Sequence, residues 1–236
     1  GGRDSQVRRL DPTMGGSTHQ AWAKGVWRLA KRQHGVVTRE QLLALGMGAR
    51  SIEHRVSNGR LHPLMRGVYA VGRPEVGRLG WWMAAVLACG PTALLSHHSA
   101  AALWGIRRAR PEDVRRADVH VVVASGNARL RPGIRVHRRR NHELPGRRDV
   151  DDIPITHPVA TLVDLAADLR DGQIEAAVNE ADHLKLVNPE QLRRALDALP
   201  RWAGVKRLRG LLDGPTITLT TTELERLFLP LAFAVG

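Results

Sequence analysis

The chain has 236 residues, 43% of them hydrophobic, with a single cysteine and a formal charge of +13. The best apolar run, Trp81 to Cys89, is too short to cross a membrane, and residues 1–17, expected to be disordered, lack the apolar core of a signal peptide. One thiol excludes an internal disulfide and fits a reducing cytoplasm. Membrane and disulfide-scaffold proteins are therefore excluded, and a cytoplasmic protein is expected.

Charge is unevenly distributed along the chain. Residues 1–75 hold 13 basic and 5 acidic side chains, residues 76–150 hold 14 and 5, and residues 151–236 hold 9 and 13. A basic region joined to an acidic one is typical of a surface that binds a polyanion, next to a region with a different role. The first two thirds therefore predict a nucleic-acid partner.

The basic region begins with three predicted helices. An apolar stripe over Gln20–Gln33 is typical of a packed first helix. Thr38 is a good N-cap for a short helix over Arg39–Leu45, and Gly46 to Gly48 form a tight turn. A further helix is expected from about Arg50 to Ser57, where Asn58-Gly59 supplies residues that end a helix.

The next segment, Arg60 to Val71, is rich in strand formers and is expected to turn near Pro63–Gly67. Helix, turn, helix and basic ribbon, in this order, predict a winged helix-turn-helix over residues 18–75 that binds double-stranded DNA. The residues expected to contact DNA are Arg39, Arg50, Ser51, His54, Arg55, Arg60, His62 and Arg66. Those between 50 and 55 are expected to turn outward toward a major groove. The alternative is a small supporting domain whose arginines are solvated.

A second domain is expected over residues 76–213, after the break at Gly72-Arg73-Pro74. It begins with a buried helix over 78–89, and Ser96 then caps another. His97 and His98 are candidate metal ligands or bases. Adjacent histidines point to different faces of a helix, and no Asp, Glu or Cys lies at ligand spacing, so we expect no metal site but a hydrogen bond at the helix start.

Two β-rich segments follow, Val119–Ala124 and Gly133–Arg138, and they are expected to pair. In the second, Arg135 and His137 should share one face. Arg138, Arg139 and Arg140 end this segment as a basic cluster. The cluster is either a second contact to DNA phosphates or a solvated edge that protects the sheet from aggregation.

From Pro154 onward the chain is expected to be helical, with helices at 159–169, 173–184 and near 189–199 and 203–212. Asp164 and Asp168, four residues apart, are either a paired site or, as we expect, an ordinary polar helix face. The predicted fold class is α+β and mainly helical, with an N-terminal winged helix-turn-helix, a mixed α/β domain containing a small sheet, and a C-terminal helical subdomain.

The order of several motifs resembles a known family. HGVVTREQLLALG, RGVYAVG, WMAAVLACGP, LSHHSAAALWG and PITHPVATLVDLA are similar, in this order, to the AbiEi-type antitoxins of bacterial type IV toxin-antitoxin systems, over roughly residues 22–228. The resemblance implies a winged helix that binds operator DNA, an autorepressor, and a following domain that neutralises a nucleotidyltransferase toxin. It carries the DNA-contact role onto Arg39, Arg50, Arg55, Arg60 and Arg66. No cofactor is expected.

The C-terminus departs from this pattern. Relatives with a similar middle section often continue, after a helix like Thr220–Phe228, into a domain resembling Vsr-like PD-(D/E)XK endonucleases. Such a fold needs carboxylates on strands to hold Mg²⁺, whereas residues 214–236, read as the first helix of a truncated nuclease-like domain, offer only Glu223 and Glu225. We therefore expect no enzymatic activity. The alternative is the DNA-targeting part of an endonuclease whose catalytic core is missing.

Overall fold

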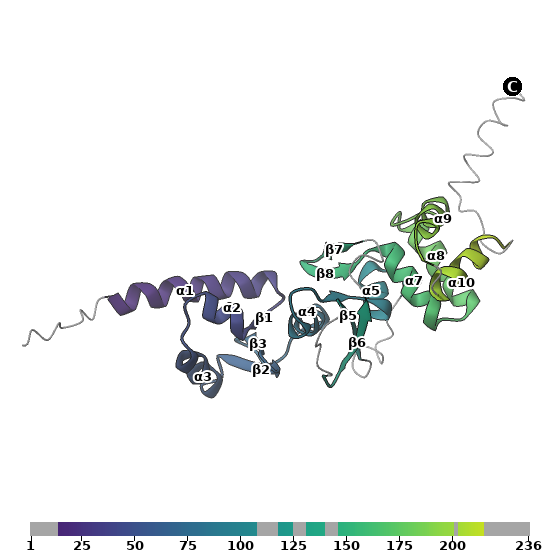
Figure 1. Ribbon diagram of the computed structural model, residues 1–236. Coiled ribbons are helices and arrows are strands. Elements are labelled where there is room, and N and C mark those ends of the chain that lie inside the picture. The colour runs from purple at the N-terminus through teal and green to yellow at the C-terminus, as the bar shows by residue number, and fades with distance from the viewer. Residues whose placement is uncertain (1–13, 108–117, 125–130, 140–145, 201–202, 215–236) are drawn as a thin grey trace, which may run out of the picture. The chain divides into compact units, whose positions relative to one another are not determined.

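The computed structural model describes residues 14–107, 118–124, 131–139, 146–200 and 203–214 (Figure 1). The chain divides into two compact units, Gly1–Ala84 and Ala85–Gly236. The division falls inside helix α4 (Arg78–Cys89), later in the chain than the expected break at Gly72–Pro74. The fold class is mixed α/β with two small sheets, as predicted.

The first unit is a winged helix-turn-helix. Its elements in chain order are α1 (Met14–Arg32), β1 (Val36–Thr38), α2 (Arg39–Ala44), α3 (Ala49–Ser57), β2 (Leu61–Met65) and β3 (Val68–Val71). The two strands of the wing were predicted. Strand β1 was not, and it pairs antiparallel with β3 to give the sheet order β1-β3-β2.

Local sequence signals fix the helices of this unit. The Thr38 hydroxyl accepts the backbone N–H of Gln41 at 3.1 Å, and the Gln41 side chain accepts the N–H of Thr38 at 2.9 Å, which forms a capping box at the start of α2. Gly67 adopts a φ of 79° in the turn between β2 and β3. Helix α1 begins at Met14, so residues 14–17 are helical rather than disordered as expected, and residues 1–13 lie outside the described residues.

One apolar core holds the helices of this unit against its sheet. Its buried members are Val26, Ala30, Val37, Leu42, Met47, Ile52 and Leu61. All but Met47, which lies in the turn between α2 and α3, come from the three helices and from two strands, so the core orients α3 relative to the wing.

The second unit contains a five-stranded sheet of order β6-β5-β4-β8-β7. Its strands are β4 (Leu94–Leu95), β5 (Val119–Ala124), β6 (Ile134–Arg139), β7 (Arg147–Val150) and β8 (Ile153–Thr156). Its helices are α5 (His97–Trp104), α7 (Pro158–Asp168), α8 (Asp171–His183), α9 (Pro189–Asp197) and α10 (Ala203–Leu212). The predicted pairing of β5 with β6 is confirmed and is parallel, with Val122 opposite His137.

Strands β4, β7 and β8 were not predicted. The chain was expected to be helical from Pro154, but Ile153–Thr156 is a strand and the helix starts at Pro158. Asp151 and Asp152, at φ of 49° and 59°, form the tight turn between β7 and β8. Strand β4 is only two residues long and pairs with segments distant in the sequence, and β7 and β8 are only four residues long each, so none of the three shows a clear local alternation.

Helix α7 lies at the centre of this unit. All residues from Pro158 to Ala166 are buried, including Asp164, which is 4% exposed. The expectation of a polar helix face is therefore wrong for Asp164, whereas Asp168 is exposed. A helix buried all round must satisfy its polar groups internally, so Asp164 requires partners in the interior.

Across the described residues, the helices lack the combination of length and apolar character that crossing a bilayer requires.

Candidate nucleic-acid interface

Helix α3 separates an apolar side from a polar one. Ile52 is 1% exposed and Val56 is half-buried, which turns their side of the helix inward. Side chains three, four and seven residues apart share a helix face, so the opposite face carries Arg50, His54 and Ser57, with Ser51 beside them. These four side chains are exposed. The structure thus brings together three of the four residues that the sequence assigned to this helix.

Arg55 differs from its prediction. It was expected to face outward, but its guanidinium lies over the Trp22 ring of α1, 4.2 Å from the ring centroid, and its Nη1 donates to the Ser51 carbonyl at 3.2 Å. Burial, and secondarily the charge of Arg60, lower the pKa of Arg55. Because the helical position of residue 55 lies at the flank of the apolar side, this side chain joins α3 to α1.

The wing and its approaches carry the remaining candidates. Arg60 is exposed between α3 and β2, and Arg66 is exposed in the turn of the wing. Arg39, at the start of α2, and His62, in β2, are partly buried. The His62 Nε2 atom is enclosed and has no hydrogen-bond partner among the described residues, so His62 contributes less exposed surface than the two wing-side arginines.

A groove of about 660 Å³, not predicted from the sequence, lies between α3 and the wing. Its apolar lining comes from Ile52, Val56, Pro63, Leu64, Met65 and Tyr69, and its charged lining from Arg39, Glu53 and Arg66. The groove therefore separates the exposed side chains of α3 from those of the wing turn.

The basic cluster at the end of β6 does not act as one patch. Arg138 is exposed on the edge strand. Arg139 forms an ion pair with buried Asp164, so it matches neither a phosphate contact nor a solvated edge. Arg140 lies outside the described residues, as do Glu223 and Glu225 of the predicted nuclease-like helix.

The two histidines at the start of α5 lie in different surroundings. His97 is 8% exposed, and its Nδ1 lies 3.1 Å from the Ser96 hydroxyl, a hydrogen bond at the helix start as expected. Ser96 occupies the N-cap position, but its side chain makes no capping hydrogen bond to the backbone. His98 is partly exposed and pairs with Asp168, at 3.8 Å between Nε2 and Oδ2. His97 also lies against His137, a contact that the sequence reasoning missed because it depends on how β6 is placed in the sheet.

Two family matches fall one in each of the two compact units of the chain. Residues 28–72 match the family described as a transcriptional regulator, AbiEi antitoxin, and residues 89–214 match the AbiEi antitoxin C-terminal domain. No curated protein matches the sequence. The first match covers most of the winged helix-turn-helix, and the second covers more than half of the chain. On these matches, the chain belongs to the AbiEi antitoxin family and has the role of an antitoxin and transcriptional regulator.

Proposed function

We propose that this protein regulates transcription by binding operator DNA in a sequence-specific way and represses its own toxin-antitoxin operon. The observation that carries DNA binding is the exposed polar face of α3, with Arg50, Ser51 and His54 side by side on a winged helix-turn-helix. The regulator family supports the same role. The excess of basic over acidic residues in residues 1–75 attracts a polyanion such as DNA.

The geometry favours base contacts from α3 and phosphate contacts from the wing. In helix-turn-helix proteins the N-terminal residues of the recognition helix meet base edges in the major groove. Arg50 is the second residue of α3, one turn before His54, which favours these two side chains as base readers. Arg60 and Arg66 lie on the approach to the wing and in its turn, where contacts to phosphates fix the register of the protein without reading sequence.

The second unit is proposed to neutralise a nucleotidyltransferase toxin encoded with this chain. The match of residues 89–214 to the antitoxin C-terminal domain supports this assignment. A cytoplasmic location is proposed on the same grounds, because the operator and such a toxin would both be met there.

The test is equilibrium binding of the full chain to a labelled duplex from upstream of its own gene, with a scrambled duplex of equal length. If four to six phosphates are neutralised, log K should fall against log salt with a slope of about −4 to −5. Arg50→Ala should weaken operator binding, whereas Arg194→Ala, which removes an exposed charge on α9, should leave it unchanged. Equal affinity for both duplexes would contradict sequence-specific binding. The absence of any salt-dependent binding to DNA would overturn the proposal.

Repression by DNA binding requires no catalysed reaction, and we also propose that the chain is not an enzyme. Incubation of supercoiled, linear or mismatched DNA with the purified protein in Mg²⁺ or Mn²⁺ should give no cleavage. Cleavage that follows the protein through purification and disappears in Glu225→Gln would contradict this and favour the endonuclease alternative.

A further inference from the structure

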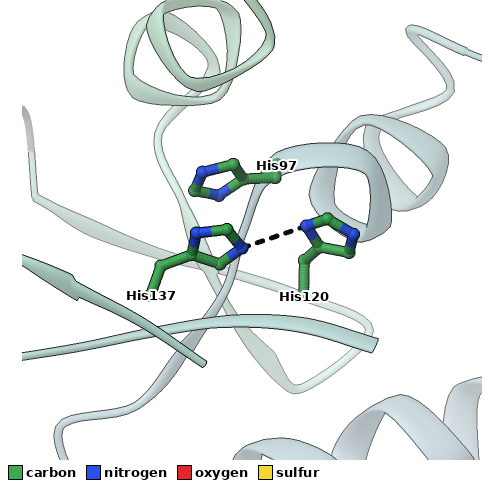
Figure 2. A group of neighbouring side chains, drawn as sticks. All are labelled: His97, His120 and His137. Atoms are coloured by element: carbon green, nitrogen blue, oxygen red, sulfur yellow. Dashed lines mark hydrogen bonds between the residues drawn. The ribbon is translucent and has the colours of Figure 1, made fainter. Parts of the chain in front are cut away.

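Three imidazole rings from separate elements meet in the second unit. His97 opens α5, His120 lies in β5 and His137 lies in β6, and one ring nitrogen of each lies within 4.8 Å of the others. Figure 2 shows the three rings converging, with His97 stacked on His137 and a hydrogen bond between His137 and His120. The stacked ring centroids are 3.6 Å apart.

We propose that His97, His120 and His137 bind a divalent transition-metal ion, with zinc as the ion that fits best. Imidazole nitrogen is a preferred ligand of Zn²⁺ and its neighbours in the first transition row, whereas Mg²⁺ and Ca²⁺ prefer oxygen. This proposal does not depend on DNA binding, because all three residues lie in the second unit.

The distances are close to those of a coordinated ion. A Zn–N bond is about 2.0–2.1 Å, so two nitrogens of a tetrahedral site lie about 3.3 Å apart. His137 Nε2 and His120 Nδ1 are 3.1 Å apart. The remaining nitrogen pairs lie within 4.8 Å, so the third nitrogen would need to approach by about 1.5 Å at most. Because the His97 and His137 rings are stacked face to face and an imidazole lone pair lies in the ring plane, metal binding requires the His97 ring to turn out of this stack.

Burial disfavours the charged form of the three rings. Burial, with the neighbouring histidines as a second cause, lowers the pKa of His97 to about 2 and that of His120 to about 3. Burial also lowers the pKa of His137. Neutral imidazole is the form that offers a lone pair to a metal.

A carboxylate lies behind one of the rings, as in many metal sites. Asp164 Oδ2 is 3.4 Å from His97 Nδ1, and this enclosed oxygen has no hydrogen-bond partner among the described residues. The other oxygen, Oδ1, accepts from Arg139. A carboxylate beside a ligating histidine fixes the ring and raises its basicity, so Asp164 is assigned as the positioning residue of His97.

The backbone at the site is also unusual. His97 adopts a φ of 49°, in the left-handed region that non-glycine residues seldom occupy. The His97 ring is stacked on that of His137, which belongs to β6. A bound ion would join α5, β5 and β6, which are far apart in the sequence, and would stabilise the second unit.

The test uses the full chain without a histidine tag, stripped with a chelator and titrated with Zn²⁺ or Co²⁺ alone. We expect one ion per chain, visible absorption bands of tetrahedral Co²⁺, and displacement of Co²⁺ by Zn²⁺. At zinc 100 times the Kd, the melting temperature should rise by about 5–10 °C.

His137→Ala should weaken zinc binding at least 100-fold, and Asp164→Asn about 10- to 100-fold. His183→Ala, at the exposed end of α8, is the matched control and should bind as the wild type does. The metal-free melting temperature of each variant shows whether it folds. The proposal is overturned if the wild type binds neither ion, whatever the variants do, or if His137→Ala binds as tightly as His183→Ala.

Discussion

Arg50 and Arg55 lie on the same helix and carry the same charge, yet their surroundings predict opposite effects of replacement by alanine. Arg50 is exposed in the first turn of α3, where a recognition helix meets bases. Arg55 lies over the Trp22 ring and is partly buried. We therefore expect Arg50→Ala to affect recognition of DNA and Arg55→Ala to affect the stability of the first unit.

The magnitudes follow from the contacts. A bidentate arginine–guanine contact contributes about 1–3 kcal/mol of discrimination, so Arg50→Ala should weaken operator binding about 5- to 150-fold and scrambled DNA much less. A cation–π contact contributes about 0.5–2 kcal/mol according to its exposure. For a chain of this size, each 1 kcal/mol lowers the melting temperature by about 2–4 °C, so Arg55→Ala should lower it by a few degrees.

Two measurements on each variant separate these effects: binding to operator and scrambled duplexes, and thermal unfolding without DNA. Arg55→Met is the control for packing, because it keeps an unbranched stem of similar length beside Trp22 without the charge. The reasoning is refuted if Arg55→Ala loses sequence preference at unchanged stability while Arg50→Ala binds the operator as the wild type does.

Three further predictions concern the wing and the second unit. Arg66→Ala should weaken operator and scrambled DNA equally and reduce the salt slope by about 1, and a loss confined to the operator would contradict the phosphate role. Gly204→Ala should lower the free energy of unfolding in urea by about 1–3 kcal/mol, because its Cβ would overlap the carbonyl oxygen of Val163, whereas Gly210→Ala on the same helix meets nothing within 4 Å. His157 caps α7, because its Nδ1 accepts the backbone N–H of Val159 at 3.2 Å. Burial, and secondarily the charge of Arg148, lower the pKa of His157 below its ordinary value of 6.5. The stability that neutral His157 contributes to the fold is therefore fully present above pH 6.5 and is lost as the pH falls. His157→Asn, a cap that does not titrate, should therefore gain up to about 1 kcal/mol on the wild type between pH 7 and pH 5; parallel pH profiles would contradict this.

Much of the first unit was predictable because its signals are local. Thr38 and Gln41 are three residues apart and cap α2, and Asn58-Gly59 ends α3 through a glycine at φ of 69°. Such patterns act within one turn of chain, so they can be read without knowledge of the tertiary structure. The three-residue strand β1 was missed because its partner β3 lies about 30 residues later in the chain and its own length gives no alternation to detect.

The second unit was less predictable because its sheet joins distant segments. Leu94–Leu95 is only two residues long and lies between β5 and β8 in the sheet. Nothing local distinguishes it from the start of the next helix. The helices at α7, α8, α9 and α10 were predicted to within a few residues, since each buries a side that recurs at helical spacing.

The histidine cluster shows what sequence spacing alone cannot reveal. His97 and His98 were considered together because they are adjacent, and they were rejected as a joint site because adjacent residues point to different faces of a helix and no Asp, Glu or Cys lies at ligand spacing. The partners of His97 lie 23 and 40 residues later, in two strands whose parallel register places His120 and His137 on the same face of the sheet. The sequence did predict that His137 shares a face of its strand with Arg135, but that face becomes part of a site only when the register and the covering helix are known. For this reason the metal test addresses the tertiary arrangement of the second unit directly: one ion per chain requires α5, β5 and β6 to be placed together as in the structure, whatever the winged helix binds.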